Sequence, residues 1–162
     1  MLSQFSGREF SAHRTGTVAR LILMRFADKS AAYALLRIAF GVNFTLHGLI
    51  RIYSGLGAFA NGTAQHLAKS PLPHGFVLGY SYAIPVIELL LGLGLAFGLF
   101  TRTALILGAI FMMGLTIGVG SNQQWDIAGQ QLVYSVVFFL LLFLVEHNAF
   151  AVDRLLARSS RV

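Results

Sequence analysis

Ionisable side chains inside apolar segments are the residues of this sequence best suited to chemistry. Glu88 lies near the middle of the long apolar run 76–100, about 18 Å along a helix from its start. An ionised, unpaired acid at that depth costs about 3 kcal/mol, so Glu88 should face other protein segments. Burial favours its neutral form unless a cation pairs with it, and we therefore predict proton exchange. The alternative is a carboxyl group that only joins two helices by a hydrogen bond.

A polar stripe runs along the apolar segment 31–53. Its members, spaced by four residues, are Asn43, His47 and Arg51. On a helix they fall within about 80° of one another, and such a stripe should not face lipid. Three further side chains share or border this sector: Phe40, Phe44 and Arg37. The stripe suits a polar headgroup held beside aromatic rings, although His47 alone could simply bond a backbone carbonyl.

The segment 127–145 repeats this device at its start. Asp126, Gln130 and Tyr134 are again spaced by four residues. Arg51 and Asp126 should lie at similar height near the outer surface, and we predict that they form an ion pair. With Glu88 below them, these side chains predict a polar cavity that opens towards the outer leaflet and binds a ligand.

The elements that position these residues are transmembrane helices. The chain is 56% hydrophobic and 11% charged, whereas soluble domains carry about 25% charged residues. Four runs have the length of a spanning helix, about 20 residues; they cover residues 31–53, 76–100, 103–120 and 127–145. Short connections after the second and third runs make neighbours antiparallel. The predicted fold is all-α, an integral membrane four-helix up-down bundle over residues 31–147.

Two further segments have amphipathic patterns. Residues 57–69 predict a short helix at the outer interface, either a lid over the bundle or an ordinary anchor. Residues 18–27 predict a short surface helix inside the basic N-terminal extension 1–30, with a disordered tail as the alternative. The basic segment 148–162 is predicted to be a C-terminal tail.

Positive charges predict the orientation. Nine basic residues fall on one side of four spans: Arg8, Arg14, Arg20, Arg25, Lys29, Arg102, Arg154, Arg158 and Arg161. The other side carries Lys69, with Arg51 at a helix end. We therefore expect a multi-pass membrane protein with both termini in the cytoplasm.

Glycine pairs in three segments predict close helix packing, within the bundle or in a homodimer. The pairs are Gly75 with Gly79, Gly94 with Gly98, and Gly114 with Gly118.

The sequence lacks the residues that several classes of function require. The chain has no cysteine, which excludes thiol relays and thiolate metal sites. His47 is the only histidine inside a predicted span, and no local spacing of metal ligands exists, so we predict no metal site and no haem. The net charge of +6 is explained by topology, and we expect no nucleic-acid partner.

The sequence resembles the DoxX family of small bacterial membrane proteins over about residues 30–156. The likeness is carried by residues 36–41 and 47–51, by Pro85 with Glu88, by residues 98–102, by Trp125, and by Asn148 with Asp153. The resemblance implies a four-helix membrane fold and an association with redox chemistry, since the related DoxD subunit belongs to a thiosulfate:quinone oxidoreductase. The missing cysteines depart from thiol-bearing relatives.

Two functions follow. The first is a quinone-linked oxidoreductase subunit that uses a partner reductant, with Glu88 and His47 as the catalytic residues. The second is a non-enzymatic scaffold or assembly factor for a redox or stress-response complex, in which the polar stripes only hold the bundle together. A cavity between His47 and Glu88 would favour the first.

Overall fold

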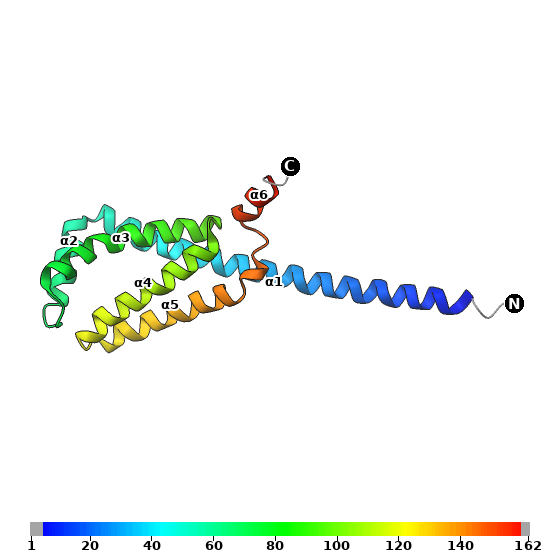
Figure 1. Cartoon of the computed structure of the whole chain (residues 1–162), viewed down its shortest axis with the longest axis horizontal. Helices are drawn as coiled ribbons and strands as arrows, with labels where there is room; N and C mark the ends of the chain where they lie inside the picture. The colour runs from blue at the N-terminus through cyan, green and yellow to red at the C-terminus, as the bar shows by residue number, and fades with distance from the viewer. Residues whose placement is uncertain (1–4, 160–162) are drawn as a thin grey trace.

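The computed structural model describes residues 5–159, with side chains from residue 24 to residue 155, and every regular element in that part of the chain is helical. In chain order the elements are α1 (Phe5–Tyr53), α2 (Leu56–His66), α3 (His74–Phe97), α4 (Thr101–Ser121), α5 (Trp125–Phe143), the 3₁₀ turn η1 (Val145–His147) and α6 (Val152–Ser159). Figure 1 shows α1, α3, α4 and α5 side by side as a bundle, with α2 at one end. This end is called the α2 end below.

Four of the described helices are long and apolar enough to cross a membrane, namely Met24–Tyr53 within α1, and α3, α4 and α5. The fold class predicted from the sequence is confirmed, with helix limits that differ by a few residues. The short helix expected in the first long connection is also present as α2.

Helix α1 is longer than the predicted span. It continues without a break from Tyr53 back to Phe5 and extends well beyond the other helices (Figure 1). No glycine or proline occurs between residues 17 and 40, so nothing interrupts the helical hydrogen bonds there. The separate surface helix predicted over residues 18–27 is therefore wrong as an independent element.

Helices α1 and α3 make the closest backbone approach of the bundle, and glycines of both helices permit it. A Cβ atom at Gly48 would lie 2.5 Å from the carbonyl oxygen of Pro85, and one at Gly41 would overlap the backbone of Ala96. Gly92 of α3 lies equally close to Thr45. These are not the predicted glycine pairs: Gly75 and Gly79 have no heavy atom within 4 Å of an added Cβ.

The end of the bundle opposite α2 is closed by polar contacts. The Arg37 guanidinium is 1% exposed and donates to the carbonyl oxygens of Leu95 and Ala96 in the last turn of α3, and to that of Phe150. Asp153 accepts hydrogen bonds from the backbone N–H groups of Phe100 (2.7 Å) and Thr101 (2.8 Å). Cations at helix C-termini and carboxylates at helix N-termini both interact favourably with the helix dipole.

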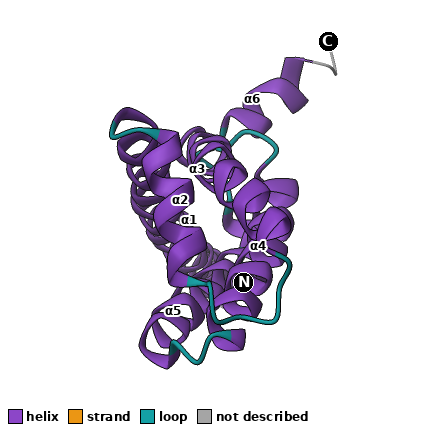
Figure 2. Ribbon diagram, turned by 90° about the vertical axis from the view of Figure 1, so that its left-hand side faces the viewer, coloured by secondary structure: helices purple, strands orange, loops and turns teal. Residues whose placement is uncertain are grey.

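Helices α4 and α5 diverge from α1 and α3 towards the α2 end (Figure 1). Figure 2 views the helices along the bundle from that end. Near the middle of the bundle, aromatic rings of α1 and α5 close the space between the two helix pairs, α1 with α3 and α4 with α5. The ring centroids of Phe40 and Phe138 are 4.8 Å apart, and those of Phe44 and Phe138 are 5.5 Å apart. This aromatic layer separates the apolar core on the side away from α2 from the wider α2 end.

Candidate functional site

An ion pair joins α1 to α3 at the centre of the site. The Arg51 guanidinium donates to both carboxylate oxygens of Glu88. The Glu88 side chain is 7% exposed and that of Arg51 is 31% exposed. The Arg51 guanidinium also lies 4.7 Å from the centre of the Phe59 ring of α2, within the range of a cation–π contact. The charge of Arg51 offsets much of the cost of burying a carboxylate at this depth.

Helix register explains this pair. Gly48 lies against the backbone of Pro85 and Leu89, which fixes the height of α1 relative to α3. Arg51 follows Gly48 by about one turn, and Glu88 lies in the α3 turn that Gly48 contacts. The long Arg51 side chain therefore reaches Glu88 along the interface of the two most closely packed helices.

The predicted pairing of Arg51 with Asp126 is wrong. Asp126 is exposed at the start of α5 and takes part in no ion pair among the described residues. Arg51 pairs with Glu88 of α3 rather than with a residue of α5. The carboxylate that most needs a cation is the buried one, Glu88.

The polar stripes of α1 and α5 meet about one turn further from the α2 end, but Asn43 and His47 are exposed there, so the α1 stripe is not fully turned away from the surface as expected. The Tyr134 hydroxyl donates to the side-chain oxygen of Asn43 at 3.3 Å, and the rings of His47 and Tyr134 are 6.4 Å apart. His47 Nδ1 lies 2.8 Å from the carbonyl oxygen of Asn43. A carbonyl only accepts, so Nδ1 carries the proton, and in the neutral ring Nε2 is the acceptor.

A cavity of about 630 Å³ lies between the two helix pairs at the α2 end. Five residues predicted for the site line it: His47, Arg51, Glu88, Gln130 and Tyr134. Asn43 and Asp126 lie outside the lining, and Arg37 belongs to the closed opposite end. The ion pair forms part of the cavity wall, and the rings of Phe44 and Phe59 also line the cavity.

Sequence reasoning missed several polar lining residues, which are Thr63, His66, Tyr80, Ser81, Gln124 and Gln131. Gln131 is the most informative, because its buried side-chain oxygen has no hydrogen-bond partner among the described residues. Buried polar atoms usually have a partner, so this amide is available to a ligand. The adjacent polar pair Gln130-Gln131 was the available signal, but four-residue spacing selected only Gln130.

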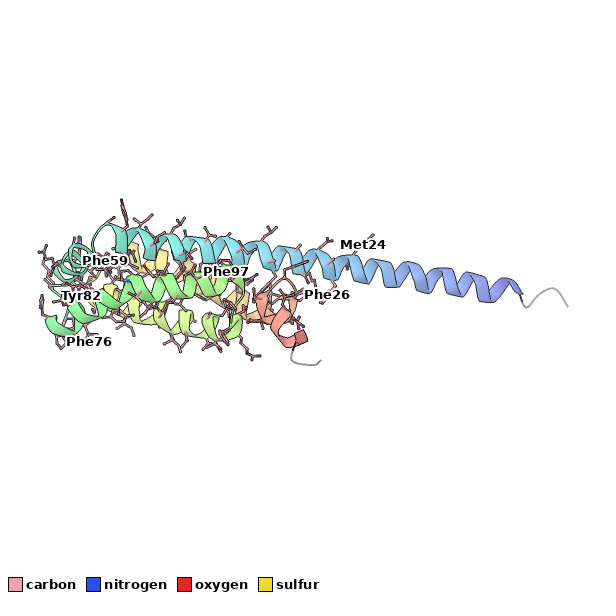
Figure 3. The ribbon with its side chains drawn as sticks, turned by 90° about the horizontal axis from the view of Figure 1, so that it is seen from above. Met24, Phe26, Phe59, Phe76, Tyr82 and Phe97 are labelled. Carbon is pink, nitrogen blue, oxygen red and sulfur yellow. The ribbon has the colours of Figure 1, made fainter. Side chains whose placement is uncertain are left out.

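Helix α2 covers the cavity at the end of the bundle. The carbonyl oxygen of His66 accepts hydrogen bonds from the side-chain amides of Asn122 (2.7 Å) and Gln124 (3.3 Å). These bonds tie the last residue of α2 to the connection between α4 and α5. Phe59, labelled in Figure 3, lies at this end of the molecule. Within the described residues, no group of three or more His, Cys, Asp or Glu side chains could hold a metal ion.

Four apolar spanning helices around a mostly apolar cavity, with a buried ion pair in its wall, define a small multi-pass membrane protein. The chain belongs to the DoxX family, whose sequence pattern matches residues 32–121, from the span of α1 to the end of α4. This match confirms the resemblance found in the sequence. Comparison with curated proteins and with solved structures gave no match.

Proposed function

We propose that this protein is the membrane subunit of a redox system and binds a quinone in the cavity at the α2 end. One observation carries the proposal: a cavity of about 630 Å³ between His47 and Glu88 has a buried ion pair in its wall. Small-molecule sites are typically about 300–1,000 Å³, mostly apolar, with a few convergent polar groups. A filled core would instead have favoured the scaffold function.

The lining residues supply what a quinone ring requires. The Tyr80 hydroxyl and the side-chain N–H groups of Gln131 can donate hydrogen bonds to the two quinone oxygens. Phe44 and Phe59 offer aromatic faces in the cavity wall, and the Phe59 face lies against the Arg51 guanidinium. Glu88 and His47 are the groups that exchange protons, because both can gain or lose one within the cavity.

The electrons must come from outside this chain. Reduction of a quinone to a quinol takes up two electrons and two protons, and a chain without cysteine has no thiol pair to supply the electrons. The proposal therefore includes a protein redox partner or a bound small reductant that contributes the electrons. Glu88 and His47 first take up protons from water and then pass them to the two quinone oxygens.

We also propose that the α2 end faces the outside of the bacterial inner membrane. Figure 1 places both chain ends and the connection from α3 to α4 away from α2. The basic residues of the N-terminal extension, Arg102 and Arg154 belong to these segments. Positive loops stay in the cytoplasm, so the termini are cytoplasmic and the cavity is reached from the outer half of the bilayer. Fusion of a reporter to each terminus tests this orientation.

Binding and turnover of a quinone by the purified protein test the function. Glu88→Gln and His47→Ala should each lower turnover by about a hundredfold, the usual effect of losing a general acid or base. Asp126→Asn makes the same carboxyl-to-amide change outside the cavity and should leave both measurements unchanged. If Glu88→Gln and His47→Ala bind and turn over quinone like the native protein, the proposed mechanism is wrong.

A further inference from the structure

The cavity has chemically different walls. The lining residues from α1 and α5 include His47, Arg51, Gln131 and Tyr134. In contrast, every lining residue from α4 is apolar or glycine: Met112, Gly114, Leu115, Ile117, Gly118 and Val119. A molecule that satisfies both walls has a polar part near the ion pair and an apolar part along α4.

The apolar wall reaches the outside of the bundle between α3 and α4. Phe76 of α3 and Ile117 of α4 line the cavity and are 60% and 66% exposed. On the α1 and α5 side, the lining residues His47, Ile127 and Gln130 are exposed as well, but two of these three are polar. Figure 3 shows Phe76 near the α2 end of the bundle. The exposed faces of spanning helices contact lipid tails, so the cavity meets the bilayer at this position. At the water-facing end of the cavity, α2 covers the bundle and is held in place by hydrogen bonds from the side-chain amides of Asn122 and Gln124.

Two glycines of α4 border this passage, and only Gly118 leaves it open. A Cβ atom added to Gly118 would meet only Leu67, at 3.9 Å, and one added to Gly114 would lie 2.9 Å from the hydroxyl oxygen of Tyr80. Gly48, by comparison, is packed directly against helix backbone. Gly114 and Gly118 therefore do not serve a backbone contact between helices. Gly118 removes a side chain from the α4 wall where the cavity approaches lipid, whereas Gly114 leaves the space that the Tyr80 hydroxyl occupies.

We propose that the cavity selects membrane-dissolved amphiphiles, whose apolar tail lies along Gly118 and enters the bilayer between α3 and α4. The polar head then lies beside Arg51 and Glu88. This inference rests on the proposed function for the identity of the head, and it adds the requirement for a tail. Small water-soluble analogues of the same head lack the contacts with α4 and bind more weakly.

Filling the passage tests this proposal. Gly118→Phe places a ring on the α4 wall, while Gly129→Phe makes the same change on an exposed part of α5 with no heavy atom within 4 Å. Both variants keep Trp125 as the only tryptophan, so quenching of its fluorescence reports quinone binding in lipid nanodiscs. Each protein is titrated with a quinone that carries several isoprene units and with the same quinone without a tail.

Gly118→Phe should weaken binding of the tailed quinone about tenfold, the effect of losing roughly two buried methylene groups. Binding of the tailless quinone should change less than twofold, and Gly129→Phe should alter neither. The tail passage is refuted if Gly118→Phe binds the tailed quinone like the native protein, or if it weakens both quinones equally.

A second measurement separates this inference from the proposed function. If the native protein binds neither quinone, the redox function fails, and native mass spectrometry of protein released from membranes then tests the passage alone. An amphiphile should accompany the native protein and Gly129→Phe, and should be lost from Gly118→Phe. No accompanying amphiphile on the native protein, or equal retention by all three proteins, would overturn the tail passage.

Discussion

Replacing Arg51 by methionine removes the cation beside Glu88 and keeps a long apolar side chain against α2. The Glu88 side chain, 7% exposed, is then left without its partner. A buried carboxyl group can avoid the cost of an unpaired charge by taking up a proton. Protonation costs about 1.36 kcal/mol for each pH unit above the reference glutamate pKa of about 4.3. The destabilisation should therefore not exceed about 3.7 kcal/mol at pH 7 and about 1 kcal/mol at pH 5.

The sign of the pH dependence follows from proton binding. In the variant, Glu88 carries a proton when folded and is ionised when unfolded above about pH 4.3, so the folded state binds more protons. The free energy of unfolding must then decrease as the pH rises from 5 to 7. The native protein, in which Arg51 supports the charged carboxylate, should show a smaller decrease over this interval.

Denaturant unfolding in detergent micelles at pH 5 and pH 7 measures these differences. The matched variants are Glu88→Gln and the double variant Arg51→Met/Glu88→Gln, which together complete a double-mutant cycle. Glu88→Gln should cost only about 1–2 kcal/mol, since Arg51 is 31% exposed and keeps access to the cavity. The double variant should be more stable at pH 7 than Arg51→Met alone. An equal loss for Arg51→Met at both pH values, or a coupling energy below about 0.5 kcal/mol, would refute the reasoning.

Three further changes test the contacts that hold the bundle. Asp153→Ala removes two hydrogen bonds at the start of α4 and should lower the free energy of unfolding by about 1–2 kcal/mol, whereas Asp126→Ala at an exposed position should change it little. Gly48→Ala places a methyl group 2.5 Å from a backbone carbonyl of α3 and should lower the free energy of unfolding by about 2 kcal/mol. The control Gly129→Ala, whose methyl group meets no heavy atom within 4 Å, should not destabilise the protein. Equal effects would contradict the close packing of α1 on α3. Arg37→Met leaves buried carbonyl oxygens without donors and should lower the free energy of unfolding by about 3 kcal/mol, which thermal unfolding measures. Ligand affinity at the distant cavity, measured by titration, should stay unchanged. A loss of affinity in folded protein would place Arg37 in the site.

The spanning helices and α2 were predictable from the sequence because their signals are local. Length and hydrophobicity identify a span without reference to any neighbour, and the periodicity of residues 57–69 indicated α2. The four-residue spacing of Asn43, His47 and Arg51 also placed polar groups on one face of α1. These properties depend on neighbours along the chain, which the sequence lists directly.

The partners of these polar groups depend on helix rotation and register, which pairs of distant residues decide. From the sequence, the position of Arg51 along the bundle axis is known only approximately. At that precision, both Asp126 and Glu88 are acids that Arg51 could pair with. Only the contact of Gly48 with the backbone of α3 turns Arg51 towards Glu88.

The glycines illustrate the same difference between what the sequence predicts and what the tertiary structure decides. The repeated spacing of Gly114 and Gly118 resembled a packing motif, yet these residues line the cavity, while Gly41, Gly48 and Gly92 allow α1 and α3 to approach. A glycine serves as a contact or as an opening according to what lies opposite it. Sequence alone therefore determined a four-helix membrane bundle with polar faces, and the tertiary structure decided which faces meet, because helix register is set by side-chain volumes across the interface.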